Sequence, residues 1–237
     1  MSEFLLQAHA LSKFYGDWPV LTGIDLGLGP GQAAMVVGSN GVGKSTLIKL
    51  LAGLSRPDTG RLLLFGREFE RGPREHKRLG VLLHYSMLYS QLSALENLRF
   101  YAQLYRLDDP GAVAASWLTR IGLERYANRP VRALSRGMEQ RLALARALIA
   151  NPDVILLDEP LTALDRQGVA LVCRLLHDAV ARGAAVLLSA HGALALEGVE
   201  LEYWRLREGR LVPWQADERS DEGRPAAAAV GSLLGQG

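Results

Sequence analysis

The sequence predicts a mixed α/β fold with an N-terminal antiparallel β subdomain and an inserted helical subdomain. Three observations predict it. Two short strand-like runs open the chain, and a turn separates them. A third apolar run, a glycine-rich loop and a segment with helical spacing then follow in the order strand, loop, helix. Between residues 93 and 127 apolar residues recur every three or four positions, so a helical block interrupts the strand-rich parts.

The expected elements follow from local patterns along the chain. Residues 154–157 are continuously apolar, which is typical of a strand buried on both faces. Asp17-Trp18-Pro19 reads as the turn between the first two strands. The expected strands span residues 4–15, 20–28, 32–37, 61–65, 78–83, 154–157 and 184–189, and residues 201–207 and 210–213 form a closing hairpin. Helices are expected at 44–54, 137–150 and 166–182, besides the 93–127 block.

The last part of the chain has a different composition. Residues 217–224 form a charge run, and residues 225–237 are rich in alanine and glycine. Such segments lack the apolar side chains that build a core. We therefore expect one folded domain over residues 3–213 and a loosely ordered tail over 215–237.

Composition limits the functional classes. The chain has 237 residues, enough for a sizeable core, and its formal net charge is only +2. Nucleic-acid binders usually carry a strong basic stripe, so we expect no nucleic-acid partner. Cys173 is the single cysteine, which excludes an intramolecular disulfide and a cysteine-based zinc site and fits a reducing cytoplasm.

Neither a secretory signal nor a membrane span is expected. The first residues lack a basic run followed by a long apolar core. Residues 26–43 carry no charge, but glycine, proline and asparagine break the stretch. Residues 183–196 are apolar but fall short of the roughly 18–20 residues that a helix needs to cross a bilayer. Any action at a membrane would therefore go through a partner.

The glycine-rich loop has the pattern of a phosphate-binding loop. Residues 38–45 read GSNGVGKS and match G-x-x-x-x-G-K-[ST] at every fixed position. The glycines let backbone N–H groups point at phosphates, and the following helix adds its positive N-terminal dipole. Lys44 would reach the β- and γ-phosphates of a nucleotide, and the Ser45 hydroxyl would ligate Mg²⁺. A glycine-rich turn with a chance lysine is the alternative, which the strand–loop–helix context disfavours.

Two carboxylates follow the buried strand at 154–157. In open α/β sheets, ligands bind at the carboxyl ends of the strands. Asp158 would hold the Mg²⁺ shell through water, and Glu159 would orient and deprotonate the attacking water. Solvated acids at a strand end are the alternative, which the neighbouring phosphate loop makes less favourable.

Further segments occur in a fixed order around this acidic pair. LSRGMEQR at 134–141 lies upstream, PLTALD at 160–165 follows, and SAH at 189–191 comes after the next expected strand. This order resembles the ATP-binding-cassette (ABC) ATPases over roughly residues 3–213. The resemblance implies the ABC-ATPase form of the P-loop NTPase fold, with a helical subdomain at about 86–133.

The resemblance also implies roles for individual residues. Glu159, His191 and Lys44 would be catalytic, with His191 contacting the γ-phosphate; a structural histidine is the alternative. Tyr15 would stack on adenine, although it could instead pack in a core, and Phe14 or Trp18 could take its place. The phosphate loop would bind ATP through Gly38, Ser39, Asn40, Gly41, Val42, Gly43, Lys44, Ser45 and Thr46.

Members of this family meet head to tail with two ATP molecules sandwiched between two cassettes. Ser135 and Gly137 would contact the γ-phosphate bound by the opposite copy, since a hydroxyl and N–H groups at a helix N-terminus suit an anion. Asp165 would lie at the dimer seam. The expected partners are therefore a second copy of the chain and an integral membrane permease, docked near residues 85–106 on the cytoplasmic face.

Two departures from the usual family pattern indicate one branch. Arg136 and Met138 replace the first glycine and the glutamine of LSGGQ, and His84 stands where most members have a glutamine that touches Mg²⁺. An imidazole can bind a metal or its water, so we expect His84 in the metal shell; a histidine without a ligand is the alternative. With residues 88–105, these features resemble the ATP-binding subunit of the haem exporter of cytochrome c maturation, which implies haem as a partner through the membrane subunit.

Other functions remain open. A transporter subunit for a drug, lipid or ion shares every motif above. Soluble ABC ATPases acting on nucleic acid or ribosomes usually carry two cassettes, long insertions or zinc-binding cysteines, which this chain lacks. A P-loop kinase or GTPase would leave LSRGMEQR without a role, and no guanine-reading N-K-x-D follows the loop.

Overall fold

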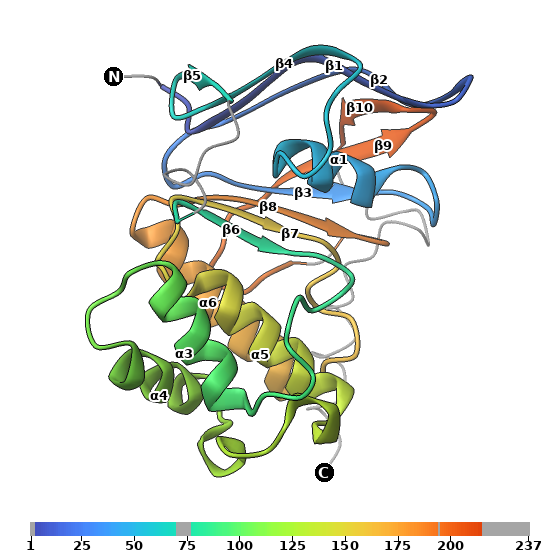
Figure 1. Cartoon of the computed structure of the whole chain (residues 1–237). Coiled ribbons are helices and arrows are strands. Elements are labelled where there is room, and N and C mark those ends of the chain that lie inside the picture. Colours follow the sequence, from blue (N-terminus) through green and yellow to red (C-terminus); the bar gives the residue numbers. More distant parts are fainter. Residues whose placement is uncertain (1–2, 70–76, 194, 215–237) are drawn as a thin grey trace.

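The computed structural model describes residues 3–69, 77–193 and 195–214. Four layers are stacked in Figure 1: an antiparallel sheet, helix α1, a mixed sheet, and a group of helices on the opposite face of that sheet. The expected tail at 215–237 lies outside the described residues.

The mixed sheet has the strand order β10-β9-β3-β8-β7-β6. All neighbours in it run parallel except β10, which pairs antiparallel with β9. Its strands are β3 (Ala33–Val37), β6 (Leu79–Leu82), β7 (Val154–Leu157), β8 (Ala185–Ala190), β9 (Glu202–Arg207) and β10 (Arg210–Pro213). Each of these matches an expected strand to within a few residues. The carboxyl ends of the parallel strands meet at one edge, on the right of Figure 1.

The antiparallel sheet has the order β2-β1-β4-β5. Its strands are β1 (Leu6–Tyr15), β2 (Trp18–Leu28), β4 (Thr59–Leu64) and β5 (Arg67–Glu68). The predicted turn at Asp17-Trp18-Pro19 is wrong, because Trp18 pairs with Tyr15 and Pro19 pairs with Phe14 inside the hairpin. Proline fits there because β2 is an edge strand, where a missing N–H is tolerated.

The helices fall into one central helix and a group below the mixed sheet. They are α1 (Lys44–Leu51), α3 (Ala94–Leu104), α4 (Pro110–Arg120), α5 (Arg136–Leu148) and α6 (Arg166–Ala181), with short 3₁₀ turns η1 (Glu124–Tyr126) and η2 (Val131–Ala133). The predicted helical block at 93–127 is therefore several helices. Ser93 caps α3 with Glu96 in a capping box, and Asp109 caps α4 just before Pro110. The domain boundaries at 3–213 and 86–133 stay predictions.

The mixed sheet separates two hydrophobic cores. Successive side chains of a strand point to opposite faces, so Met35 packs toward α5 and α6 while Val36 packs toward α1. Strand β7 is buried along its whole length because both faces are covered, as its continuous apolar run predicted. The sheet is thereby a rigid support for the loops at its carboxyl edge.

Candidate active site

The glycine-rich loop joins β3 to α1 at the carboxyl edge of the mixed sheet (Figure 1). Gly43 is the N-cap of α1 and has a φ of 115°, which non-glycine residues rarely adopt. A Cβ on Gly43 would also lie 3.1 Å from the Cγ1 atom of Val20 in β2. Close packing against the first hairpin therefore requires glycine here. Ser45 and Thr46 occupy the first turn of α1.

Lys44 is 5% exposed, and its ammonium group lies on the loop itself. It donates hydrogen bonds to the carbonyl oxygens of Gly38 (2.7 Å) and Ser39 (3.0 Å). It also lies 3.7 Å from Oε1 of Glu159. The buried cation is therefore held by oxygen atoms at the place where the motif predicts phosphate oxygens.

The acidic pair follows β7 at the same edge of the sheet. Asp158 is 3% exposed, whereas Glu159 is only half-buried. The Ser189 hydroxyl at the end of β8 donates to Oδ1 of Asp158 at 2.7 Å, and it accepts from the backbone N–H of Glu159 at 3.0 Å. No local sequence pattern predicts these contacts of Ser189, which the sequence shows only as part of the SAH segment.

His191 completes a compact group with Lys44 and Glu159. Its Nε2 atom lies 3.0 Å from Oε2 of Glu159, and its side chain is 55% exposed. The two oxygens of Glu159 thus face Lys44 on one side and His191 on the other. Three side chains predicted to be catalytic are brought together from α1, the end of β7 and the end of β8.

The LSRGMEQR segment begins helix α5. Ser135 is its N-cap, with an exposed side chain that accepts from the N–H of Met138 at 3.3 Å. A Cβ on Gly137 would lie 3.0 Å from the carbonyl oxygen of Ala163, so the backbones pack closely there. Within the described residues, neither Ser135 nor Gly137 forms a hydrogen bond with the phosphate loop.

The PLTALD segment links the acidic pair to α6. Asp165 is exposed and caps α6, because its Oδ1 atom accepts from the N–H of Gly168 at 2.7 Å. Gln140 of α5 donates to the carbonyl oxygen of Pro160 at 3.1 Å. This contact, which sequence reasoning missed, ties the helix that carries Ser135 to the loop after Glu159.

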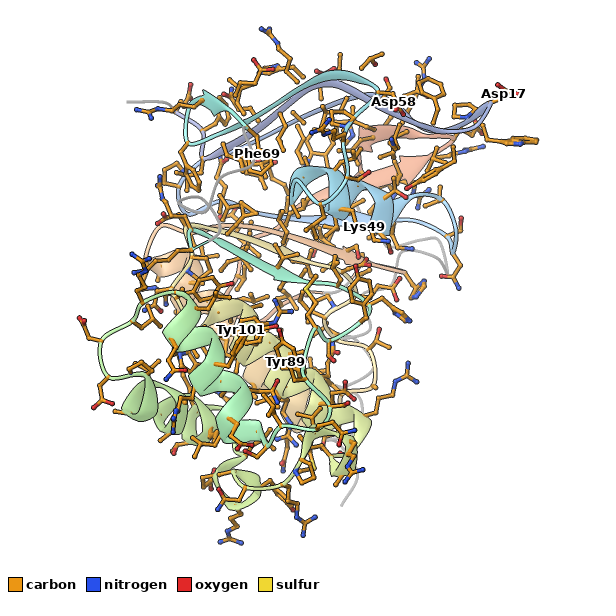
Figure 2. The ribbon with its side chains drawn as sticks, in the orientation of Figure 1. Asp17, Lys49, Asp58, Phe69, Tyr89 and Tyr101 are labelled. Atoms are coloured by element: carbon orange, nitrogen blue, oxygen red, sulfur yellow. The ribbon has the colours of Figure 1, made fainter. Side chains whose placement is uncertain are left out.

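Tyr15 lies at the end of the first hairpin, whose tip is marked by Asp17 in Figure 2. Its side chain is exposed, and so are those of Phe14 and, at 78%, Trp18. The hairpin approaches the phosphate loop through Val20, which packs on Gly43. The structure thus leaves all three aromatic residues open to stack on a base.

His84 is exposed two residues beyond the end of β6. Strand β6 is the neighbour of β7, and the N–H of Asp158 donates to the carbonyl of Leu82 at 2.8 Å. His84 therefore emerges at the same sheet edge as the acidic pair. No group of three or more His, Cys, Asp or Glu side chains placed for a metal occurs in the described part of the chain.

Arg146 of α5 fastens the stretch that carries His84. Its guanidinium donates to the carbonyl oxygens of Val81 (2.8 Å) and Ser86 (3.2 Å). The Ser86 hydroxyl donates to Glu139, also on α5, at 2.6 Å. Burial lowers the pKa of Arg146. These bonds, which no local sequence pattern announces, tie the segment after β6 to α5.

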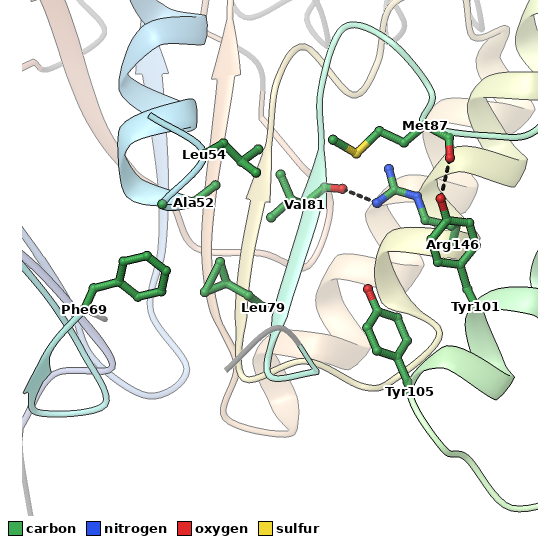
Figure 3. A pocket seen from close by; sticks show the side chains of 10 residues that line it. Ala52, Leu54, Phe69, Leu79, Val81, Met87, Tyr101, Tyr105 and Arg146 are labelled. Carbon is green, nitrogen blue, oxygen red and sulfur yellow. Dashed lines mark hydrogen bonds between the residues drawn. The ribbon is translucent and has the colours of Figure 1, made fainter. Parts of the chain in front are cut away.

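An apolar groove of about 440 Å³ opens beside this segment, between the end of α1, β6 and α3 (Figure 3). Tyr101 and Tyr105 of α3 line it, and burial raises the pKa of both phenols. Tyr101 donates to the carbonyl oxygen of Met87, and the rings of Tyr101 and Tyr89 lie near each other on the helical side of the mixed sheet (Figure 2), with centroids 6.5 Å apart. The full lining is Ala52, Gly53, Leu54, Phe69, Leu79, Val81, Met87, Tyr101, Tyr105 and Arg146. None of the helices among the described residues is both long enough and apolar enough to cross a bilayer.

A phosphate loop between a strand and a helix, with an acidic pair at the end of another parallel strand of the same sheet, defines a P-loop nucleotide-binding protein. The ABC transporter family model matches residues 21–162 of the chain. The chain belongs to the ABC transporter family.

Two relatives of this chain have names that give different functions. The chain is 39% identical over 200 residues to the cytochrome c biogenesis ATP-binding export protein CcmA of Methylococcus capsulatus, a match that covers 84% of this chain and 96% of that protein. It is 37% identical over 190 residues to the Nod factor export ATP-binding protein I of Cupriavidus metallidurans, which covers 79% of this chain. That match spans only 63% of the Nod factor relative.

A solved ATP-binding cassette, a dimer in a post-hydrolysis state with ADP and Pi bound, has the same fold. The TM-score is 0.80 at 26% identity, over 92% of this chain and 99% of that chain. The predicted ABC-ATPase fold, with its mixed α/β core and antiparallel β subdomain, is thus confirmed, and the chain is an ATP-hydrolysing enzyme of this class.

Proposed function

We propose that this chain is the ATP-binding subunit of a membrane exporter and lies at the cytoplasmic face of the membrane. The convergence of Lys44, Glu159 and His191 at one sheet edge carries the proposal. In it, the loop from Gly38 to Thr46 and the N-terminus of α1 surround the phosphates of ATP, and an aromatic side chain of the first hairpin, Tyr15, stacks on adenine.

ATP binding changes the partners of Lys44. Its ammonium exchanges the carbonyl oxygens of Gly38 and Ser39 for phosphate oxygens. Glu159 then accepts a proton from the attacking water. His191, which is within hydrogen-bond distance of Glu159, contacts the γ-phosphate.

The oxygen donors at the site fit Mg²⁺, which prefers hydroxyl, carboxylate and water ligands. The Ser45 hydroxyl and a water held by Asp158 would bind it, with His84 contacting a further water. When bound, Mg²⁺ neutralises charge on the phosphate oxygens.

The second half of the site comes from a second copy of the chain. Ser135 and Gly137 lie at the N-terminus of α5, where N–H groups and a hydroxyl favour an anion. Neither forms a hydrogen bond with its own phosphate loop in the described residues, and the solved relative is a nucleotide-bound dimer. We assign Ser135 and Gly137 to the γ-phosphate of the opposite copy and Asp165 to the dimer seam.

The membrane permease docks in the apolar groove beside residues 85–106. Apolar and aromatic side chains line it, which suits a helix presented by a membrane protein. Tyr85, Tyr89 and Phe100 are exposed around this region, a composition typical of protein interfaces.

Haem export or handling for cytochrome c maturation is the proposed cargo function. It is supported by the match over 96% of the cytochrome c biogenesis relative and by His84 with LSRGMEQR. Export of a Nod factor, or of another cargo such as a drug, lipid or ion, is the second candidate, since the Nod factor relative is 37% identical.

Co-purification from the native membrane tests this function. We expect a tagged chain to recover an integral membrane protein that carries haem, and deletion of the chain to abolish cytochrome c. A membrane partner without haem, with cytochrome c intact, would favour the second candidate. Recovery of ribosomes or DNA without any membrane protein would contradict the transporter function and support a soluble ABC ATPase.

A further inference from the structure

Ser189 lies at the end of β8 and is 1% exposed. It pairs with Val36 of β3, one residue before the strand reaches the phosphate loop. Side chains alternate along a strand, so Ser189 shares the sheet face of Leu187, which packs in the core under α1. A buried polar side chain there needs hydrogen-bond partners. Ser189 has two, and they belong to Asp158 and Glu159.

The hydroxyl of Ser189 donates one hydrogen bond and accepts another, and the two bonds go to different residues of the acidic pair. Its proton goes to Oδ1 of Asp158 at 2.7 Å, and its oxygen accepts the N–H of Glu159 at 3.0 Å. A hydroxyl has one donor, so donating to Asp158 requires an acceptor oxygen on that carboxyl group. One side chain thereby orients a carboxylate and the adjacent peptide together.

The peptide that Ser189 holds is unusual. Glu159 has a φ of 49°, in the left-handed region that a non-glycine residue adopts only when its surroundings fix it. That conformation turns the Glu159 side chain out of the strand direction and toward Lys44 and His191. Loss of the hydrogen bond from the Glu159 N–H to Ser189 would loosen the backbone of Glu159, the proposed general base.

We propose that Ser189 is a positioning residue for hydrolysis, whose hydroxyl aligns Asp158 and Glu159 through two hydrogen bonds. The inference rests on the proposed roles of these two acids. Ser189 does not touch the nucleotide in this proposal and exchanges no proton with it. Partners one shell away from metal-binding groups commonly change metal affinity or activity roughly 10- to 100-fold when removed.

Four variants separate the effect of the Ser189 hydroxyl from the effect of side-chain shape. Ser189→Ala removes both hydrogen bonds, and Ser189→Thr keeps the hydroxyl. Ser189→Val has the shape of threonine without the hydroxyl, so the Thr and Val pair controls for the added methyl group. If Ala or Val does not fold, Ser189→Cys keeps the size of serine with a weak donor.

In steady-state assays we expect kcat to fall roughly 10- to 100-fold for Ala and Val, with the Mg²⁺ concentration for half-maximal rate raised and ATP affinity within about threefold of wild type. Ser189→Thr should stay within about threefold of wild type in kcat. The kcat of Ser189→Cys should lie between those of Ser189→Ala and wild type.

Amide hydrogen exchange on the nucleotide-free, metal-free protein gives an independent readout. The Glu159 amide should exchange slowly in wild type and Thr, and faster in Ala and Val. Equal protection in all variants, or a kcat that Thr does not restore, would overturn the inference. Parallel loss of ATP affinity and thermal stability would reduce Ser189 to a structural role and overturn it as well.

The Glu159→Gln variant distinguishes this inference from the proposed function. If Glu159→Gln keeps full turnover, the proposed function of the acidic pair fails whatever Ser189 does. If Glu159→Gln is inactive while Ser189→Ala is fully active, the inference about Ser189 alone fails.

Discussion

Lys44 is a buried cation that, in the proposed mechanism, exchanges its carbonyl partners for phosphate oxygens. Its buried ammonium group is held by two loop carbonyls and faces Glu159. Phosphate oxygens are stronger acceptors for an ammonium than neutral carbonyl oxygens, because both partners are charged. The free site thus keeps the cation in place for a nucleotide at little cost in rearrangement.

Lys44→Ala should weaken ATP binding roughly 10- to 100-fold, since one charge-assisted hydrogen bond contributes about 1.5–3 kcal/mol. Lys49→Ala is the matched control, because Lys49 is on the same helix in its last turn and away from the loop. Titration with a fluorescent ATP analogue measures both. Equal affinities for the two variants would contradict the role of Lys44.

At the scale of single residues, the sequence predicted the phosphate loop and the acidic pair because phosphate and metal binding require those residue types at that spacing. It also predicted His191 from its place after a strand. It did not assign a role to Ser189, Gln140 or Arg146. Each of these makes its contacts with a segment 20 or more positions away, and a single polar residue in an apolar run carries no local pattern.

At the scale of elements, two helix caps coincide with proposed contacts of the dimer. Ser135 caps α5 and Asp165 caps α6. A cap stabilises its own helix, so a loss of activity after substitution has two possible causes. A substitution that keeps the helix cap but removes the proposed dimer contact separates the two causes.

Asp165→Ala should lower the free energy of unfolding by about 1 kcal/mol, because the N–H of Gly168 loses its acceptor. Asp165→Ser keeps a capping oxygen and should stay within about 0.5 kcal/mol of wild type. Urea unfolding measures both. If Asp165→Ser unfolds as wild type but dimerises more weakly with ATP, the carboxylate acts at the seam; wild-type dimerisation of both variants would contradict that assignment.

Element boundaries were predictable only where a local signal marks them. The capping box at Ser93 and the pair Asp109-Pro110 divide the helical block, but periodicity alone merged its helices. The first hairpin turns one residue earlier than expected because cross-strand pairing takes in Trp18 and Pro19. The two-residue strand β5 is too short to produce a pattern.

At the scale of the whole molecule, the order of the strands in the mixed sheet could not be predicted from local sequence patterns. The order β9-β3-β8-β7-β6 puts β8 between the strand of the phosphate loop and the strand of the acidic pair. That order is why a side chain of β8 can serve both acids. It depends on tertiary packing between segments far apart in the sequence, so no local pattern encodes it.

Hydrogen bonds also connect the apolar groove, where we propose that the permease docks, with α5. Arg146 and Glu139 of α5 hold the segment of Ser86, which borders the apolar groove. A permease seated in the groove would therefore act on the helix that begins at Ser135. Dimer closure on ATP and reopening after hydrolysis would move the same helix, which couples the ATPase cycle to the membrane partner.

The central claim is that each site hydrolyses ATP with Glu159 and is completed by a second copy. Sedimentation of Glu159→Gln with and without MgATP tests it most directly, with Lys44→Ala/Glu159→Gln as the weaker-binding control at an ATP concentration that saturates only the single variant. The variant should bind ATP, turn over roughly 100-fold or more slowly, and sediment as a dimer only with ATP, while the control stays monomeric. A Glu159→Gln protein that binds ATP yet remains monomeric, or that hydrolyses ATP at the wild-type rate, would contradict the account.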